Sequence, residues 1–195
     1  MKSSYLRPAL ALALALGLAA CGGTETFTVA GSIQGLAHPG LVLTNNGGAD
    51  LAVAGNSTTF AFPSSIEYGE TYDVKIKTQP AHQTCEIDPN FDSDTAGRMA
   101  SINIPVRCFT NTFTVGGKIS GLTTEGLVLT NGTAGGTVKV AKDATAFAMP
   151  NPVPYGESYG VTVLEQPAGL TCTVTNGVGE MGDAKVESVQ VTCGS

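Results

Sequence analysis

Four acidic side chains lie close together in the first half of the chain, at a spacing that could hold a cation. They are Glu86, Asp88, Asp92 and Asp94. Carboxylate oxygens are ligands that Ca²⁺ prefers, but this is not an EF-hand loop, because the twelfth position counted from Asp92 is Asn103 and not a bidentate glutamate. Asp88, Asp92 and Asp94 are therefore weak candidate metal ligands. We interpret the stretch as a solvated acidic loop and predict no metal and no cofactor.

The two histidines, His38 and His82, stand in no recognisable metal-binding or catalytic motif. A nucleophilic Ser or Thr needs a base and a group that orients the base, and the Gly-x-Ser-x-Gly pattern is missing from the sequence. We interpret both histidines as loop residues. No catalytic residue is predicted, and the chain is not expected to be an enzyme.

The N-terminus carries the features of an export signal. Lys2 and Arg7 precede a run of Ala and Leu over residues 9–20, which is too short to span a membrane as a helix. The run ends in Leu18-Ala19-Ala20-Cys21, which resembles the lipobox of bacterial lipoprotein signals. The resemblance implies cleavage after residue 20 and attachment of a diacylglycerol to Cys21, which would anchor the chain to a membrane.

The residue after this cysteine is Gly22 and not Asp, which in such lipoproteins favours the outer membrane or cell surface over the inner membrane. Two or more acyl chains hold a protein stably on a bilayer, whereas one chain gives marginal binding. The expected location is therefore the cell envelope, with the membrane as a partner through the lipid. Residues 21–26 would form the tether.

Without residues 1–20 the chain has 8 basic and 16 acidic residues, a net charge of −8. An acidic surface argues against nucleic acid as a partner, because that affinity depends on Lys and Arg neutralising phosphates. It equally argues against a polybasic contact with anionic lipid. Solubility is the simplest reason for the excess of acid.

The mature sequence is one unit written twice. The hexapeptide at residues 40–45, Gly-Leu-Val-Leu-Thr-Asn, returns unchanged at residues 126–131, and similar motifs follow in the same order at offsets of 85–87 residues. We place the first repeat at residues 27–109 and the second at 110–195. A repeat this long is a whole domain and not a solenoid unit. The hexapeptide is interpreted as a covered strand followed by a turn, not as a binding motif.

Each repeat is predicted to be a seven-stranded antiparallel β-sandwich, so the fold class is all-β. In the first repeat the strands are expected at 26–34, 40–45, 49–54, 57–62, 71–78, 83–88 and 100–108. Apolar and polar residues alternate in these segments, and Asn-Gly turn signals separate them. No helix is expected.

Four cysteines remain after Cys21, and in an exported chain they are expected to form disulfides. Four cysteines permit three connectivities. Each repeat has its own pair on the inward parity of its strands, which favours Cys85–Cys108 and Cys172–Cys193. Each bond would close a loop of about 22–24 residues and contribute roughly 3–3.5 kcal/mol in the chain-entropy model.

The order of motifs resembles a bacterial envelope repeat that is often found in tandem on lipoproteins. The shared pattern is Gly-Leu-Val-Leu, Tyr-x-Val-x-Val, Gln-Pro, Cys and a final Val-x-Val-x-Cys, and it covers nearly all of residues 27–193. The resemblance implies an immunoglobulin-like or prealbumin-like sandwich, and part of it is also similar to carboxypeptidase regulatory-like modules. The buried Trp and the Tyr before the second Cys of immunoglobulin domains are missing, which leaves the strand topology open.

Two further features concern surfaces. Tyr68, Tyr72, Tyr155 and Tyr159 recur at equivalent positions and could stack on sugars or anchor a protein, although the second of each pair is better interpreted as core. Phe109 is expected to pack between the repeats, which would then form a rod with little hinge motion.

The preferred function is a non-enzymatic structural or interaction module on the envelope. The alternative is a carbohydrate- or peptide-binding adhesin, with a glycan or an envelope protein as partner.

Overall fold

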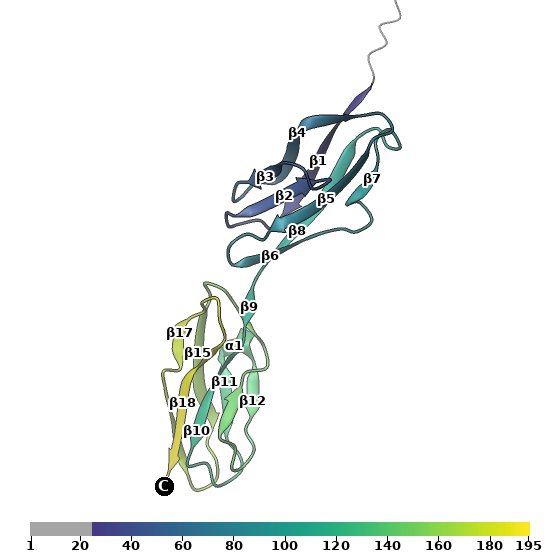
Figure 1. Ribbon diagram of the computed structural model, residues 1–195. Helices are drawn as coiled ribbons and strands as arrows, with labels where there is room; N and C mark the ends of the chain where they lie inside the picture. The colour runs from purple at the N-terminus through teal and green to yellow at the C-terminus, as the bar shows by residue number, and fades with distance from the viewer. Residues whose placement is uncertain (1–24) are drawn as a thin grey trace, which may run out of the picture.

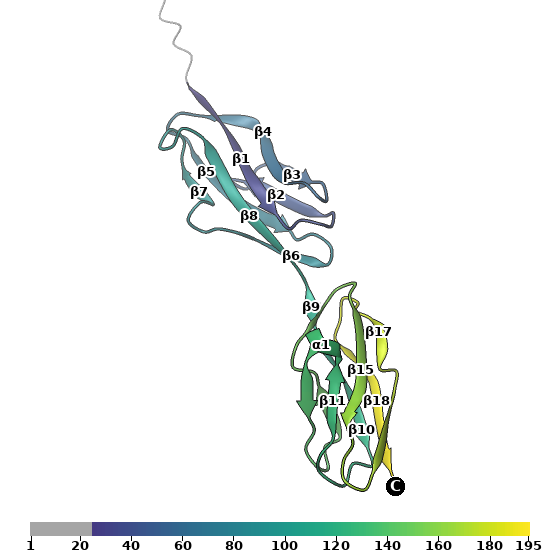
Figure 2. The same ribbon diagram turned by 180° about the vertical axis from the view of Figure 1, so that it is seen from behind.

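The computed structural model describes residues 25–195, and its elements there are strands apart from one helical turn, α1 (Gly132–Gly135). The all-β prediction is thereby confirmed, and the single turn corrects the expectation that no helix would form. Figures 1 and 2 show two β bodies arranged end to end, with β1 starting at one end and the C-terminus at the other. In this part of the chain no helix is long and apolar enough to cross a bilayer. The predicted signal peptide and Cys21 lie outside the described residues.

The first body, called repeat one below, contains two four-stranded sheets with the orders β4-β1-β8-β6 and β3-β2-β5-β7. Its strands are β1 (Thr26–Gln34), β2 (Leu41–Asn45), β3 (Asp50–Val53), β4 (Thr59–Glu67), β5 (Thr71–Thr78), β6 (Gln83–Ile87), β7 (Ser93–Thr95) and β8 (Ile102–Thr110). One hydrophobic core lies between the sheets. Val29 and Ile104 enter it from the first sheet and Leu43 and Val74 from the second, all at most 1% exposed.

The second body, called repeat two, has the same plan. Its strands are β9 (Thr112–Phe113), β10 (Val115–Ser120), β11 (Val128–Asn131), β12 (Thr137–Lys139), β13 (Ala146–Ala148), β14 (Val153–Pro154), β15 (Ser158–Glu165), β16 (Thr171–Thr175), β17 (Val178–Glu180) and β18 (Val186–Gly194). The main sheets are ordered β13-β10-β18-β16 and β12-β11-β15-β17, and β9 pairs with β14. The equivalent orders show that the two halves of the sequence fold alike.

Strand pairing differs from the prediction in two respects. The sheets are not purely antiparallel, because β1 runs parallel to β8 and β10 runs parallel to β18. A parallel pair needs a long connection, and the first and last strands of each repeat are joined by almost the whole repeat. The short strands β7 and β17 raise the number in the two main sheets of each repeat from seven to eight within residues 25–195. They are only three residues long and follow no alternation, so the pattern did not reveal them.

The strand order also bears on the topology that the sequence left open. In an immunoglobulin constant domain the first strand pairs with the second, and the second and third lie in different sheets. Here β1 pairs with β4 and β8, and β2 forms a hairpin with β3 in the other sheet. The order is therefore not that of an immunoglobulin domain.

The predicted tether of residues 21–26 is too long at its C-terminal end. Thr26 already pairs with Glu67 in the β1–β4 ladder, and the Glu25 carbonyl accepts a hydrogen bond of 3.0 Å from the Tyr68 amide. Glu25 and Thr26 therefore belong to repeat one. At the other end of repeat one, β8 continues to Thr110, one residue beyond the predicted boundary.

Candidate functional site: the junction between the repeats

The connection between the repeats is a single residue, Asn111, between β8 and β9. Its amide donates to the His82 carbonyl of repeat one, and its own carbonyl accepts from the Tyr155 amide of repeat two, both at 2.9 Å. The Thr84 hydroxyl donates to the Asn111 side-chain oxygen at 2.7 Å. Since both backbone groups and the side chain of this residue are bonded, the connection is held by both domains and is not a free linker.

Three rings pack together beside this residue. The His82 imidazole stacks on the Tyr155 ring with 3.7 Å between centroids and 5° between planes. His38 meets both rings edge-on, at 5.1 Å from His82 and 6.0 Å from Tyr155. Stacked and edge-to-face aromatic pairs each contribute roughly 0.5–1.5 kcal/mol beyond the area they bury. The cluster joins two loops of repeat one to the β14–β15 turn of repeat two.

An ion pair or hydrogen bond completes the junction. The His82 Nδ1 lies 2.8 and 2.9 Å from the two carboxylate oxygens of Asp183, in the loop between β17 and β18. One face of the His82 ring therefore touches Tyr155 while one edge bonds Asp183. Both partners belong to repeat two, so a single side chain of repeat one contacts two separate loops of its neighbour.

His82 adopts a backbone conformation that favours glycine. Its φ is 60°, and the equivalent residue of repeat two is Gly169, whose φ is 73°. An L-residue in this left-handed region costs roughly 1–2 kcal/mol. Repeat one thus carries a side chain at a turn where repeat two has none, and that side chain makes the junction.

The loop that carries His38 is held by a buried amide. Gln83 is only 2% exposed. Its Oε1 accepts from the Ala37 and His38 amides at 2.8 and 3.0 Å, and its Nε2 donates to the Gly35 carbonyl at 2.7 Å. The apolar Leu170 occupies the equivalent position in repeat two. The polar residue is therefore specific to the repeat whose loop supports an interface.

The sequence predicts His38 and His82 to be separate loop residues, and the structure brings them together. Their spacing of 44 residues hides this, and the only signal was their absence from repeat two. The His82–Asp183 pair resembles the base and orienter of a catalytic triad, but a triad also needs a nucleophile bonded to the second ring nitrogen. Within residues 25–195 the side-chain hydrogen bonds of His82 go to Asp183. The His82–Asp183 pair therefore holds repeat one against repeat two.

Phe109 does not pack between the repeats, which corrects the prediction. It lies on the outer face of β8 and is 56% exposed. Strand parity explains this, because Cys108 points into the core and the next residue must point out. The junction is formed instead by His38, His82 and Tyr155.

The recurring tyrosines have different surroundings. Tyr72 is 7% exposed in the first core, as predicted, and Tyr159 is half-buried against the second. Tyr155 lies in the junction, whereas its equivalent Tyr68 is 67% exposed. The two Tyr-Gly turns thus have the same sequence, but the Tyr155 ring is covered by His82 and the Tyr68 ring is open to solvent.

The acidic stretch does not assemble into a metal site. No group of three or more His, Cys, Asp or Glu side chains in the described part of the chain could hold a metal ion. Asp94 bonds the Arg98 guanidinium at 2.9 Å and the Thr95 amide, contacts that lower the pKa of its carboxyl. Asp88 accepts from the Asn90 amide and side chain, which lowers its pKa in the same way. Burial, followed by the charges of Asp94 and Asp92, raises the pKa of Tyr72.

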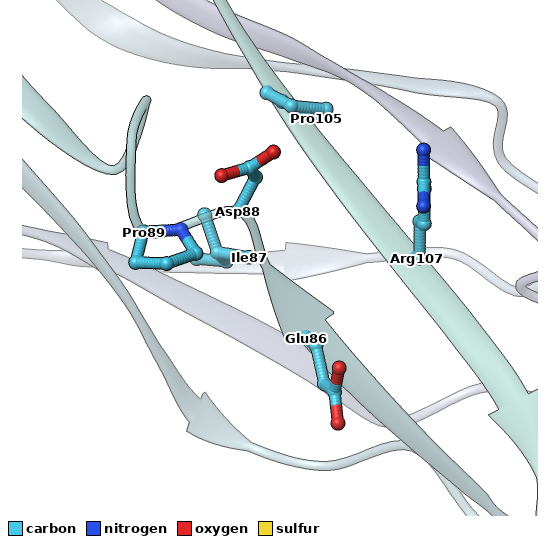
Figure 3. Close-up of a pocket in the computed structure, with 6 residues that line it drawn as sticks. All are labelled: Glu86, Ile87, Asp88, Pro89, Pro105 and Arg107. Atoms are coloured by element: carbon cyan, nitrogen blue, oxygen red, sulfur yellow. The ribbon is translucent and has the colours of Figure 1, made fainter.

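A cavity of about 280 Å³ lies beside this stretch and is bounded by β6, the two residues after it and β8. It is lined by Glu86, Ile87, Asp88, Pro89, Pro105 and Arg107. Figure 3 shows the carboxylates of Glu86 and Asp88 pointing in different directions, with Arg107 to one side. Glu86 and Arg107 stand opposite each other in the β6–β8 ladder. The acidic groups therefore do not converge on one point in this cavity.

The disulfides join Cys85 to Cys108 and Cys172 to Cys193, the pairing that strand parity favours. Each bond links directly opposed residues of neighbouring strands, β6–β8 and β16–β18. The repeated Gln-Pro motif adds support: the Gln79 side chain accepts from the Cys85 amide at 2.7 Å and donates to its carbonyl at 3.0 Å. Gln166 bonds Cys172 in the same way. The proposed lipidation residue, Cys21, is outside the described region.

Comparisons with known proteins give little further information. No family model and no curated protein sequence matches the chain. Among solved structures it is similar to the shaft pilin spaA from Lactobacillus rhamnosus GG, at 10% identity over 88% of this chain and 99% of that one, with a TM-score of 0.32. A major pilin from Streptococcus pyogenes matches at 10% identity over 87% and 97%, also with a TM-score of 0.32. Scores this low carry no argument about fold or function.

Proposed function

We propose that the chain is a lipid-anchored, non-enzymatic envelope protein that works as a two-domain spacer and interaction module. The lipobox-like sequence ending at Cys21 supplies the anchor. Two disulfide-bonded sandwiches supply a body that survives in an oxidising compartment. The free end of repeat two is then held away from the membrane on the outer-membrane or cell-surface side.

The observation that carries the proposal is the junction. A flexible linker between binding modules is usually rich in Gly and Ser. Here one residue connects the domains, with bonds to both, and the stack of His82 on Tyr155 fixes their relative rotation. Two domains held end to end in a fixed orientation suit a spacer, which keeps the free end of repeat two at a set distance from the membrane.

The anchor and the spacer are tested separately. Cells producing the full-length protein should incorporate radiolabelled palmitate into it, and Cys21→Ser should abolish the label and release the protein from the membrane fraction. Small-angle scattering of the soluble fragment 22–195 should show one extended shape. A label that persists in Cys21→Ser argues against the anchor, and a broad range of interdomain distances argues against the spacer.

A second candidate function is ligand binding at the free end of repeat two. A cavity of about 440 Å³ opens there between the ends of β11, β12 and β15, within the size range of small-ligand sites. Glu125, Lys139 and Glu165 give it polar groups, and Leu127 and Val140 give it apolar ones. Such a lining suits a sugar or a peptide.

A glycan array and a peptide library probed with fragment 22–195 test this candidate. Binding that is lost in Lys139→Ala, with unchanged thermal stability, would support the adhesin-like function. If neither library is bound, the spacer function stands alone.

A further inference from the structure

The end of repeat one at which β1 begins exposes an aromatic and an apolar side chain. It consists of Glu25, the β4–β5 turn over residues 67–70 and the β7–β8 loop over residues 96–101, and is called the proximal end below. Backbone bonds tie these segments together: the Tyr68 amide to Glu25, the Gly69 amide to Ala96 and the Ala96 amide to Glu70, at 2.7–3.0 Å. Tyr68 is 67% exposed and Met99 is 59% exposed.

Tyr68 is held in place although it is exposed. Its ring lies against Gly97, where a Cβ atom would collide with the ring carbons. Gly97 has a φ of 92°, which only glycine adopts readily. The chain therefore presents one face of this ring in a defined orientation while the other is packed.

Repeat two shows what such a turn can do. The residue equivalent to Tyr68 is Tyr155, whose ring is covered by His82. Tyr68 therefore occupies the same position in repeat one as Tyr155 does in repeat two, but no ring covers it. The chain's own histidine-bearing face is already occupied by Tyr155, and the free end of repeat two has Thr124 and Gly169 in place of the histidines. A second copy therefore has no matching face to offer Tyr68.

The length of chain before repeat one identifies a different occupant. Cys21 is four residues from Glu25, which allows a separation of at most about 14 Å. A lipid on that cysteine would hold the proximal end within reach of the headgroup layer. Tyrosine is enriched at the membrane interface because its ring is apolar and its hydroxyl is polar.

We propose that the proximal end of repeat one is a membrane-contact surface that seats Tyr68 and Met99 among zwitterionic phospholipid headgroups. The inference rests on the proposed lipid anchor at Cys21. Charge selects the lipid class: Glu25, Glu67 and Glu70 lie at this end, and its arginine, Arg98, is paired with Asp94. An anionic surface would repel this end, whereas phosphatidylethanolamine or phosphatidylcholine would not. The contact would stand the rod on its end.

The chain contains no tryptophan, so a single introduced one reports on its own surroundings. Lipidated full-length protein carrying Tyr68→Trp is reconstituted into phosphatidylcholine vesicles with and without brominated acyl chains. Met99→Trp is a second reporter in case the first variant folds poorly. The matched control is Leu164→Trp, a position 56% exposed on β15 of repeat two. We expect a blue shift and a loss of emission in brominated vesicles for the proximal reporters and not for the control. Added anionic lipid should weaken both effects.

Four results would overturn the inference. Anchored protein whose proximal reporters are not quenched by brominated lipid leaves the anchor intact and rejects the contact. A blue shift that depends on protein density and not on bromination assigns the end to a protein partner instead. Equal quenching of all reporters shows that the rod lies flat. If mass spectrometry finds no lipid on Cys21, the proposed function and this inference fall together.

Discussion

At the scale of single residues, the repeated polar side chains of this protein serve the backbone. Asn45 and Asn131, which end the two identical hexapeptides, accept hydrogen bonds from the Asp73 and Gly160 amides of the neighbouring strand. The hexapeptide is therefore structural, as its pattern of apolar and turn residues predicts. Asp88, in the loop before β7, and Asp94, in β7 itself, are likewise bonded to near neighbours.

Asn131→Ala should destabilise repeat two more than Asn45→Ala destabilises repeat one. Asn131 is only 5% exposed, so its loss leaves the half-buried Gly160 amide without its partner, at a cost of about 1 kcal/mol or more. Asn45 is half-buried, and water can replace its oxygen. Hydrogen exchange read by mass spectrometry in mild denaturant assigns the loss to each repeat. Equal losses of stability in the two repeats would contradict this account. A variant that loses a binding activity but keeps its stability would show that the hexapeptide binds a ligand.

Acid should weaken repeat one partly through Asp94. Arg98 first and the Thr95 amide second lower the pKa of this carboxyl below the ordinary value of 3.8. A lowered pKa in the folded state gives stability that is present above the unfolded value and lost as the pH falls through the folded one. Asp94→Asn should therefore flatten the dependence of the urea midpoint on pH below 5, and Arg98→Gln should act in the same direction. A midpoint that falls as steeply in both variants as in the unchanged protein would reject the role of this pair.

At the scale of elements, each repeat depends on the close approach of its first and last strands. A Cβ on Gly31 would meet the Ile104 carbonyl, and one on Gly117 would meet the Val189 carbonyl. These glycines let the parallel strands β1–β8 and β10–β18 lie side by side in the sheet that also carries the disulfide. Alternation alone indicates which residues face the core but does not indicate which strands become neighbours.

Gly117→Ala should cost repeat two about 1–3 kcal/mol or more, the usual penalty for forcing atoms into a packed site. Gly160→Ala is the matched control, since it is also a strand glycine of repeat two and a Cβ there meets nothing within 4 Å. Thermal unfolding followed by circular dichroism compares the two. A Gly117→Ala protein as stable as the control would show that the strands can separate without penalty.

At the scale of the whole molecule, the orientation of the repeats depends on one side chain with two partners. His82 contacts Tyr155 and Asp183 in different loops, so it resists both bending and rotation at Asn111. The same side chain adopts a backbone conformation that repeat two assigns to glycine. The local backbone would therefore be more stable with glycine at position 82, whereas the orientation of the domains requires the histidine side chain.

His82→Gly separates these two effects. Repeat one should lose little stability, because glycine relieves the left-handed backbone while it adds freedom to the unfolded chain. The junction should loosen, because the stack and the bond to Asp183 are both lost. Fluorescence energy transfer between labels on the two repeats should broaden in distance, while the melting temperature of each repeat changes little. Tyr155→Ala removes the stack from the other side and should broaden it as well. An unchanged distance distribution in both variants would show that Asn111 alone holds the domains.

Much of the architecture follows from local patterns. Alternating residues predicted all seven main strands of repeat one, and the internal repeat predicted that the second half would match. Parity also indicated the cysteine pairs, because a buried cysteine needs a neighbour on the same side of a sheet. These features depend on properties of a strand that its own sequence carries.

The sequence by itself therefore determined the strands, their buried faces and the duplication, because these arise from the two-residue period of a strand and from turn chemistry. The tertiary structure alone decided that β1 and β8 are parallel neighbours and that His38, His82, Tyr155 and Asp183 meet. Such contacts join residues from 44 to more than 100 positions apart, and no local period encodes them. The β1–β8 pairing forms only when a whole repeat folds, and the junction contacts form only when two folded sandwiches bring their ends together around Asn111.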